Sequence, residues 1–272
     1  MNPPDIDRTF AGSIPQLYER YLVPLIFEPY AADLASRVVL RQPSRVLEVA
    51  VGTGVVTRQL ANTLPAGVSI LATDLNQPML DQAAAAGTTR PVEWRQADAM
   101  QLPFPDEAFD VVVCQFAVMF FPNKQKAFSE ARRVLRPGGC FIFNVWDRIE
   151  QNEFADTVTQ SLTSAFSDNP PRFLARVPHG YHDISAIAQD LACGGFERSL
   201  VFTTLAARSR ADSPRIPAVA YCQGTPLRSE IETRDPSRLV VATETAAAAI
   251  ESRFGSGAVD GKIQAHIITI ER

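Results

Sequence analysis

The chain has 272 residues, of which 46% are hydrophobic, and a formal net charge of −4 at pH 7. This length and composition can fill one good-sized hydrophobic core, with room for a lid. Acidic and basic residues are interspersed rather than gathered in runs, so the sequence predicts no basic surface for phosphate backbones and excludes nucleic acid as an expected partner.

The first residues, MNPPDIDRTF, carry prolines and charges where a signal peptide would need a basic start and an apolar stretch. No run approaches the ~18 apolar residues of a membrane span. We therefore expect a cytoplasmic protein without membrane insertion. The cysteines are far apart, form no CxxC and lie within apolar patterns, so we expect reduced core thiols and no metal site. They are Cys114, Cys140, Cys193 and Cys222.

In chain order, residues 15–40 come first and carry apolar side chains at helical spacing, which predicts one or two covering helices. Between residues 45 and 146, apolar runs alternate with amphipathic stretches, as in a parallel sheet buried on both faces. The predicted strands span residues 45–50, 69–73, 92–96, 109–115 and 140–146. The predicted helices span residues 55–64, 77–86 and 124–135, and the sequence Arg136-Pro137-Gly138-Gly139 ends the last of them.

The remaining segments predict helices at residues 153–165 and 184–193, then strands at residues 196–206 and 262–271. The alternation in the final strand is typical of a half-exposed antiparallel member. Residues 213–254 contain four prolines and an alanine-rich helix and lie between the last two strands. We interpret them as an inserted cap. The expected organisation is covering helices at residues 1–43, a core of residues 44–212 and 255–272, and a cap at residues 213–254.

A glycine turn follows the first predicted strand, in Glu48-Val49-Ala50-Val51-Gly52-Thr53-Gly54. A ligand that crosses such a turn needs glycine, because a Cβ would hold the backbone away. Asp74 lies twenty residues after Gly54, at the end of the second strand, where a carboxylate can accept hydrogen bonds from both hydroxyls of an adenosine ribose. The spacing predicts an adenosine cofactor and also fits a dinucleotide.

Two residues favour a cofactor other than a dinucleotide. Position 57 is Thr57, where a dinucleotide fingerprint has a third glycine beneath the pyrophosphate. Glu48 precedes the turn, where an acid can meet a free α-amino group directly or through water. S-adenosylmethionine has that ammonium group and NAD does not.

The segments VLEVAVGTG, ATDLNQPML, QADAMQLPFPDEAFDVVVCQF and EARRVLRPGG resemble the successive motifs of class I S-adenosylmethionine-dependent methyltransferases, in the ubiquinone- and menaquinone-biosynthesis-type branch. The resemblance runs from about residue 45 to residue 146. It implies an α/β, Rossmann-like, doubly wound sheet of seven strands, mostly parallel with an antiparallel last strand. One departure is Ala50, where many members have glycine, and we expect crowding there without loss of binding.

The resemblance also assigns roles in binding S-adenosylmethionine and its product S-adenosylhomocysteine. The glycine turn would lie under the methionine and ribose portions, through Ala50, Gly52, Thr53 and Gly54. Asp74 would hold the ribose hydroxyls. The other implied contacts are Leu75 and Met79 beside the adenine, Asp98 and Ala99 at its rim, Gln115 and Phe116 at the methionine end, and Tyr18 closing the pocket.

Methyl transfer is an in-line displacement that depends mainly on orientation, so a dedicated catalytic residue is not required. A base would help a phenol, alcohol or carbon acid, and the candidates are Asp147, His179, Tyr181 and His182. The predicted cap and N-terminal helices should enclose the pocket, and an enclosed pocket indicates a small-molecule acceptor. Two alternatives stay open: a non-catalytic S-adenosylmethionine-binding sensor or partner subunit, and an NAD(P)-dependent oxidoreductase. The pattern leaves the acceptor, the methylated atom and the oligomeric state open.

Overall fold

A computed structural model describes residues 7–272. The chain divides into two compact units. The sheet unit consists of Glu28–Val145, His182–Leu205 and His266–Arg272, and the helical unit consists of the described part of Met1–Phe27 with Trp146–Tyr181 and Ala206–Ala265. No helix among residues 7–272 is long and apolar enough to cross a membrane.

The described residues form a seven-stranded sheet in the order β3-β2-β1-β4-β5-β7-β6. Its strands are β1 (Arg45–Val49), β2 (Ser69–Asp74), β3 (Glu93–Gln96), β4 (Phe109–Gln115), β5 (Leu135–Trp146), β6 (Val201–Ala211) and β7 (Val259–Glu271). β1 pairs in parallel with β2 and β4, as β2 does with β3 and β4 with β5. The parallel core predicted from buried apolar runs is confirmed.

The last strand, β7, runs against β5. Arg272 N donates to Gly139 O (2.9 Å), and Asp147 N donates to Gln264 O (3.0 Å). Residues later along β5 therefore pair with residues earlier along β7, which is the antiparallel arrangement. An antiparallel last strand on a mostly parallel sheet is the predicted fold class.

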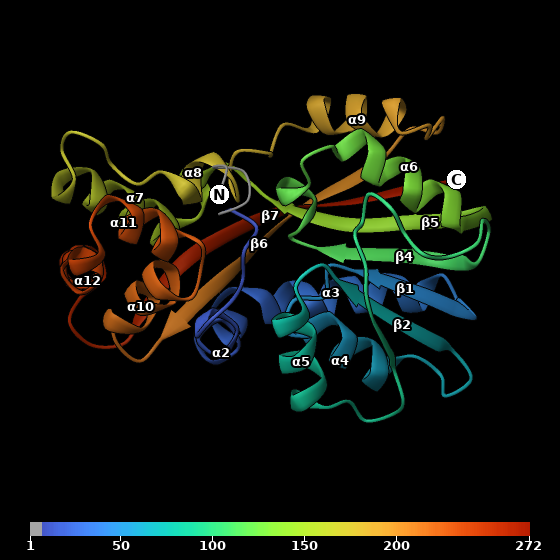
Figure 1. The fold of residues 1–272 in the computed structure, drawn as a ribbon, viewed down its shortest axis with the longest axis horizontal. Helices are drawn as coiled ribbons and strands as arrows, with labels where there is room; N and C mark the ends of the chain where they lie inside the picture. The colour runs from blue at the N-terminus through green and yellow to red at the C-terminus, as the bar shows by residue number, and fades with distance from the viewer. Residues whose placement is uncertain (1–6) are drawn as a thin grey trace. The chain divides into compact units, whose positions relative to one another are not determined.

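Helices of the sheet unit lie on both sides of its strands (Figure 1). In that view α6 and α9 lie together beside β5, and α4 and α5 lie beside β1 and β2. The bounds are α3 (Glu28–Leu40), α4 (Val55–Thr63), α5 (Gln77–Ala86), α6 (Lys124–Val134) and α9 (Ile184–Cys193), with the 3₁₀ turn η2 (Val118–Phe120).

The helical unit contains α2 and η1 of the predicted N-terminal helices, whereas α3 belongs to the sheet unit, and it also contains the helices of the predicted cap. Within this unit, α10 packs on α12, η1 and α2, and α12 packs on α7. The bounds are α2 (Ile14–Leu17), η1 (Tyr18–Phe27), α7 (Glu153–Ala165), α8 (Phe173–Arg176), α10 (Arg215–Gln223), α11 (Leu227–Arg234) and α12 (Leu239–Phe254), with short turns η3 (Ile149–Gln151) and η4 (Pro236–Arg238). Pro24 lies inside η1, which is a π-helix, and its missing N–H group removes one backbone hydrogen bond there.

Three local expectations are corrected. β5 was expected to begin at Cys140 but begins at Leu135, so it includes the proline and glycines that follow α6, and a register shift lies between Phe109 and Val111. β6 begins at Val201 because Phe196 belongs to the end of α9, where its N–H donates to Leu191 O (3.1 Å). Cys193 is exposed, unlike the three buried thiols, because it ends α9 on the solvent side.

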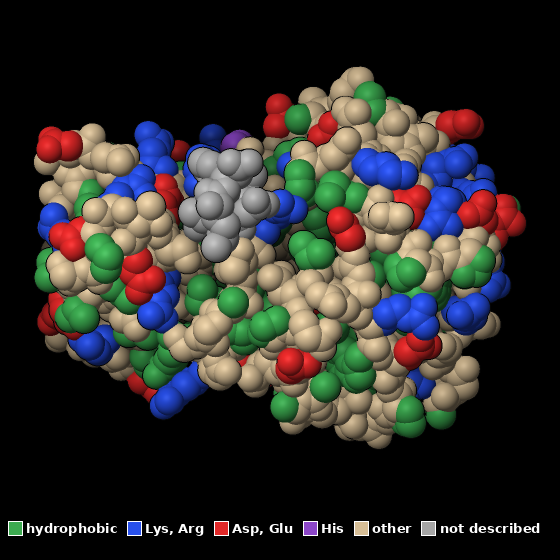
Figure 2. All heavy atoms as spheres, in the orientation of Figure 1, with side chains coloured by type: hydrophobic (Ala, Val, Ile, Leu, Met, Phe, Trp, Pro, Cys, Tyr) green, Lys and Arg blue, Asp and Glu red, His purple; other side chains and the backbone are tan. Residues whose placement is uncertain are grey.

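Charges of both signs mix on the surface. Figure 2 shows Lys and Arg side chains among Asp and Glu over the visible face. Many form ion pairs, such as Arg133 with Glu130 and Asp106 (2.8 Å each). The intermingling agrees with the interspersed charges of the sequence.

Candidate functional site

The glycine turn connects β1 to α4 in the sheet unit. Its residues Ala50, Gly52 and Gly54 have φ of 56°, 57° and 83°. Val51 anchors the turn, since its N–H donates to Thr73 O (2.9 Å) and its side chain packs with Ala72 and Leu80. Ala50 stands where many family members have glycine. Its left-handed conformation costs an L-residue about 1–2 kcal/mol, so this departure adds backbone strain.

Gly54 also meets a packing limit. A Cβ built on it would lie 3.1 Å from the Cβ of Ala83 on α5 and 3.4 Å from the Trp94 ring of β3. Glycine here lets α5 and β3 approach the start of α4 closely.

Asp74 ends β2 and joins the two loops beside it. Its Oδ2 accepts from Gly52 N (2.9 Å), and its Oδ1 accepts from Asn76 N (2.8 Å). The side chain is buried, and burial raises the pKa of its carboxyl above the ordinary value. The Asn76 side-chain amide also donates to Oδ1, at 3.4 Å. Because a carboxylate has lone pairs for about four hydrogen bonds, capacity remains for a hydroxyl donor.

Glu48 lies inside β1 and is almost fully buried. The Thr57 hydroxyl donates to its Oε2 at 2.6 Å. Desolvation by burial raises the pKa of Glu48 to about 8, while the Thr57 hydrogen bond and nearby Arg58 oppose that rise. Sequence reasoning weighed Thr57 only as a missing glycine. Thr57 follows Glu48 by nine residues, on the helix after the strand, and this spacing could have indicated that the two side chains meet.

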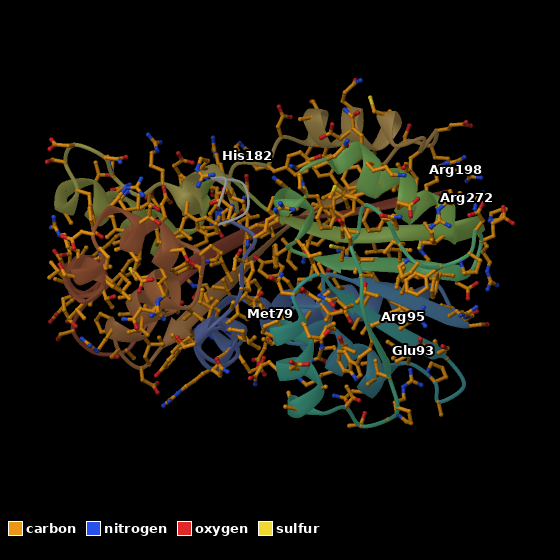
Figure 3. All side chains as sticks on the ribbon, viewed as in Figure 1. Met79, Glu93, Arg95, His182, Arg198 and Arg272 are labelled. Carbon is orange, nitrogen blue, oxygen red and sulfur yellow. The ribbon has the colours of Figure 1, made fainter. Side chains whose placement is uncertain are left out.

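The residues assigned to the adenine lie near the ends of β2 and β3. Leu75 follows Asp74 and is 43% exposed, whereas Met79 on α5 is buried (Figure 3). Asp98 Oδ1 accepts from Met100 N (2.8 Å), so this carboxylate forms a turn, and Ala99 inside that turn is half-buried. Asp74 and Asp98 thus have local turn roles, and a ligand role for either carboxylate remains a prediction.

A second strained turn follows β4. Phe116 has φ of 48°, and its N–H donates to Asn144 Oδ1 on β5 at 2.8 Å. Sequence reasoning did not single out Asn144, because an asparagine inside an apolar strand shows no partner until the strand register is known. The register places it opposite Gln115.

Three buried polar atoms near these turns have no hydrogen-bond partner among the described residues. They are Thr53 Oγ1, Gln115 Oε1 and Asn144 Nδ2. Buried polar atoms are rarely left unpaired, so each of these three is a candidate for a hydrogen bond to a polar ligand.

Tyr18 and three of the four candidate bases belong to the helical unit. Tyr18 stacks on Phe27 with centroids 4.9 Å apart. The Asp147 carboxylate accepts from Gln264 Nε2 (2.6 Å), and His179 Nδ1 lies 2.9 Å from the Asp147 carbonyl oxygen, as a donor in that tautomer. Tyr181 is half-buried.

His182, also half-buried, belongs to the sheet unit (Figure 3). The catalytic role of all four residues remains a prediction.

The strand order, the antiparallel β7 and the glycine turn after β1 define the class I methyltransferase fold. An S-adenosylmethionine-dependent methyltransferase of Thermotoga maritima has this fold, with a TM-score of 0.55, 17% identity and coverage of 98% of this chain and 99% of that one. A family model described as a methyltransferase domain matches residues 47–143.

Two curated relatives extend the match. The ubiquinone/menaquinone biosynthesis C-methyltransferase UbiE of Azotobacter vinelandii is 30% identical over 173 residues, which cover 58% of this chain and 68% of that protein. The demethylmenaquinone methyltransferase of Thermus thermophilus is 40% identical over 114 residues, or 41% of this chain and 50% of that protein. The chain belongs to the class I S-adenosylmethionine-dependent methyltransferase family, of the ubiquinone/menaquinone type. It spans about half the length of the Thermus relative.

Proposed function

We propose that this chain binds S-adenosylmethionine and transfers its methyl group to a small-molecule acceptor. The observation that carries the proposal is the Asp74 carboxylate, which is hydrogen-bonded to Gly52 N of the glycine turn and to Asn76 N before α5. This arrangement fixes an acceptor group beside a turn whose glycine allows close approach of a ligand. A carboxylate held in this way can accept hydrogen bonds from the hydroxyls of an adenosine ribose, which supports the proposal.

The residues present fit this cofactor. The unpartnered Oγ1 of Thr53 and Oε1 of Gln115 offer polar groups on two loops of the site. Leu75 exposes an apolar side chain beside Asp74, where the flat face of an adenine could pack. A buried carboxyl on Glu48 suits a ligand ammonium group, because an ion pair there would offset the cost of burying the charge.

When bound, the cofactor supplies a methyl group on a sulfonium sulfur, and an acceptor lone pair displaces that sulfur. The chain's own task is to hold the reactants in line, which alone can supply much of the rate enhancement. In this proposal Asp74 accepts from the ribose hydroxyls, Glu48 faces the ammonium, and the Gln115–Phe116 turn holds the methionine end. A base among Asp147, His179, Tyr181 and His182 remains a prediction for acceptors that must lose a proton.

The names of two relatives indicate a class of methyl acceptor. One is named demethylmenaquinone methyltransferase and the other ubiquinone/menaquinone biosynthesis C-methyltransferase. The match to the Thermus protein covers only half of that protein, so a quinone-precursor ring is the first acceptor to test rather than an established substrate. A cytoplasmic location likewise remains part of the proposal.

Calorimetric titration tests the cofactor first. Wild-type protein should bind S-adenosylmethionine and S-adenosylhomocysteine but not NADH. Asp74→Ala should abolish binding because it removes the carboxylate that accepts hydrogen bonds from the ribose hydroxyls. Gly52→Val should also abolish it, because φ is 57° at this position and valine rarely adopts that conformation. Asp81→Ala is the matched control, since Asp81 is exposed on α5 and bonded to Gln77.

Binding of NADH without binding of either adenosyl compound would contradict the proposal and make the glycine turn a dinucleotide site. Binding of the adenosyl compounds without methyl transfer to any acceptor in a broad screen would favour the non-catalytic alternative.

A further inference from the structure

Phe116 has a backbone conformation that a bulky residue rarely adopts. Its φ is 48°, and its side chain is only 5% exposed. Left-handed conformations of large residues persist only where the surroundings hold them, and they concentrate at functional sites. The contacts that hold Phe116 are therefore informative.

Two contacts within the sheet unit hold it. Asn144 Oδ1 accepts the Phe116 N–H (2.8 Å). The Tyr30 ring meets the Phe116 ring edge-on, with centroids 5.2 Å apart and planes at 89°. Tyr30 is itself fully buried, and its hydroxyl donates to Leu205 O (3.2 Å). One contact fixes the backbone of Phe116 and the other fixes its ring.

The orientation of the Asn144 amide follows from its partner. Because Phe116 offers an N–H donor, the amide must present its oxygen, and Nδ2 then points elsewhere. Asn144 is fully buried, and its Nδ2 has no partner among the described residues. A buried donor without a partner is unfavourable for folding, so stability alone does not explain an asparagine here.

Gln115 repeats the pattern on the neighbouring strand. It lies opposite Asn144 in the β4–β5 register, and its Oε1 is also buried without a partner. A free donor and a free acceptor thus come from paired residues next to the strained Phe116. They place a hydrogen-bond donor and an acceptor near the carboxyl ends of β4 and β5, at the edge where ligands of parallel α/β sheets bind.

We propose that Asn144 is a positioning residue, which holds the Gln115–Phe116 turn in the conformation that receives the methionine end of the cofactor. This inference rests on the proposed function. Asn144 acts through the backbone of Phe116, and its loss should weaken ligands that carry the amino-acid portion while sparing those that lack it.

The test compares two ligands on one variant. S-adenosylhomocysteine carries the amino-acid portion, and 5′-methylthioadenosine carries the same adenosine without it. Calorimetry on Asn144→Leu, which keeps the branching of the side chain and removes the acceptor, should show an affinity loss of about tenfold for S-adenosylhomocysteine, the scale of one lost hydrogen bond. The affinity for methylthioadenosine should stay within about twofold of wild type, a change smaller than a hydrogen bond contributes. Asn144→Asp keeps an acceptor for the Phe116 N–H and should restore part of the loss.

Asn152→Leu is the matched control. Asn152 is another buried asparagine, in the helical unit, and its amide is bonded at both ends, from Nδ2 to Asp147 O (3.3 Å) and from Gln264 N to Oδ1 (3.1 Å). It should reduce thermal stability without changing the ratio of the two affinities. If Asn144→Leu does not fold, Asn144→Ala, which leaves room for water, takes its place in the comparison.

Equal weakening of both ligands by the Asn144 variants, or no weakening of either, would overturn the inference and leave the proposed function intact. If the wild-type protein bound neither ligand, the proposed function would be wrong and the inference would fall with it.

Discussion

At the scale of single residues, Glu48 shows how an acid can be kept inside a parallel sheet. It is 1% exposed, and the Thr57 hydroxyl is its hydrogen-bonding partner at 2.6 Å. The hydrogen bonds from Thr57 and the charge of Arg58 do not offset the desolvation of the carboxylate, so burial raises its pKa to about 8. The group is therefore mostly protonated at neutral pH in the ligand-free protein.

This shift predicts that the ligand-free protein loses stability as pH rises from about 5 to 8. In that window the folded state keeps the Glu48 proton, because its pKa is about 8, while the unfolded state, with a pKa near 4.5, has released it. The folded state binds more protons, so the free energy of unfolding falls with increasing pH. Thermal unfolding followed by circular dichroism at several pH values measures the slope.

Glu48→Gln is the variant that isolates this effect. It removes one titrating group and should reduce the decline, leaving the part of the slope that comes from Asp74, whose pKa burial also raises. An unchanged slope in Glu48→Gln would show that Glu48 is ionised in the folded protein.

At the scale of elements, the start of α4 is held by close packing as much as by turn geometry. Gly54 has φ of 83°, and an added Cβ would crowd Ala83. Gly138 has nearly the same φ, 80°, with nothing within 4 Å of an added Cβ. Substitutions at the two positions therefore distinguish the cost of the left-handed backbone from the cost of crowding an added Cβ.

We predict that Gly138→Ala lowers the free energy of unfolding by about 1–2 kcal/mol, the cost of the left-handed conformation. Gly54→Ala should lower it by about 1–3 kcal/mol more, because overpacking adds to that cost. Urea denaturation monitored by tryptophan fluorescence measures both. Equal losses would mean that α5 moves away without cost.

Much of the sheet unit was predictable, because strands buried on both faces appear as apolar runs and amphipathic helices separate them. The bounds of β4, α5, α7 and α9 were predicted to the residue. β6 was placed five residues early because Phe196 continues the apolar pattern, while its N–H belongs to the end of α9. The π-helix around Pro24 was missed because no periodicity distinguishes it from an α-helix.

The site was predictable where it depends on position along the chain. Gly52, Gly54 and Asp74 fall at strand ends, and the structure joins Gly52 to Asp74 by a hydrogen bond. Thr57 and Asn144 were missed because their roles depend on which side chain or backbone group faces them across elements. Such pairings come from the register, which the sequence pattern does not specify.

At the scale of the whole molecule, the residues predicted to bind the cofactor do not all belong to one of the two units. Those assigned to the cofactor belong to the sheet unit except Tyr18, which lies in η1 of the helical unit beside Phe27. The role of Tyr18 comes from the resemblance alone. Its test therefore has to report on each segment of the chain separately.

Hydrogen exchange with and without saturating S-adenosylhomocysteine provides that test. A ligand that binds only the folded state stabilises it by about 2.7 kcal/mol at 100 times its Kd, so bound segments should exchange more slowly. We expect slower exchange in peptides covering Ala50–Gly54, Asp74–Met79 and Gln115–Phe116, and in the peptide that contains Tyr18. In Asp74→Ala, the same ligand concentration should change none of them. Protection of the first three segments without the fourth would remove Tyr18 from the site, while the glycine turn and Asp74 would keep their assigned roles.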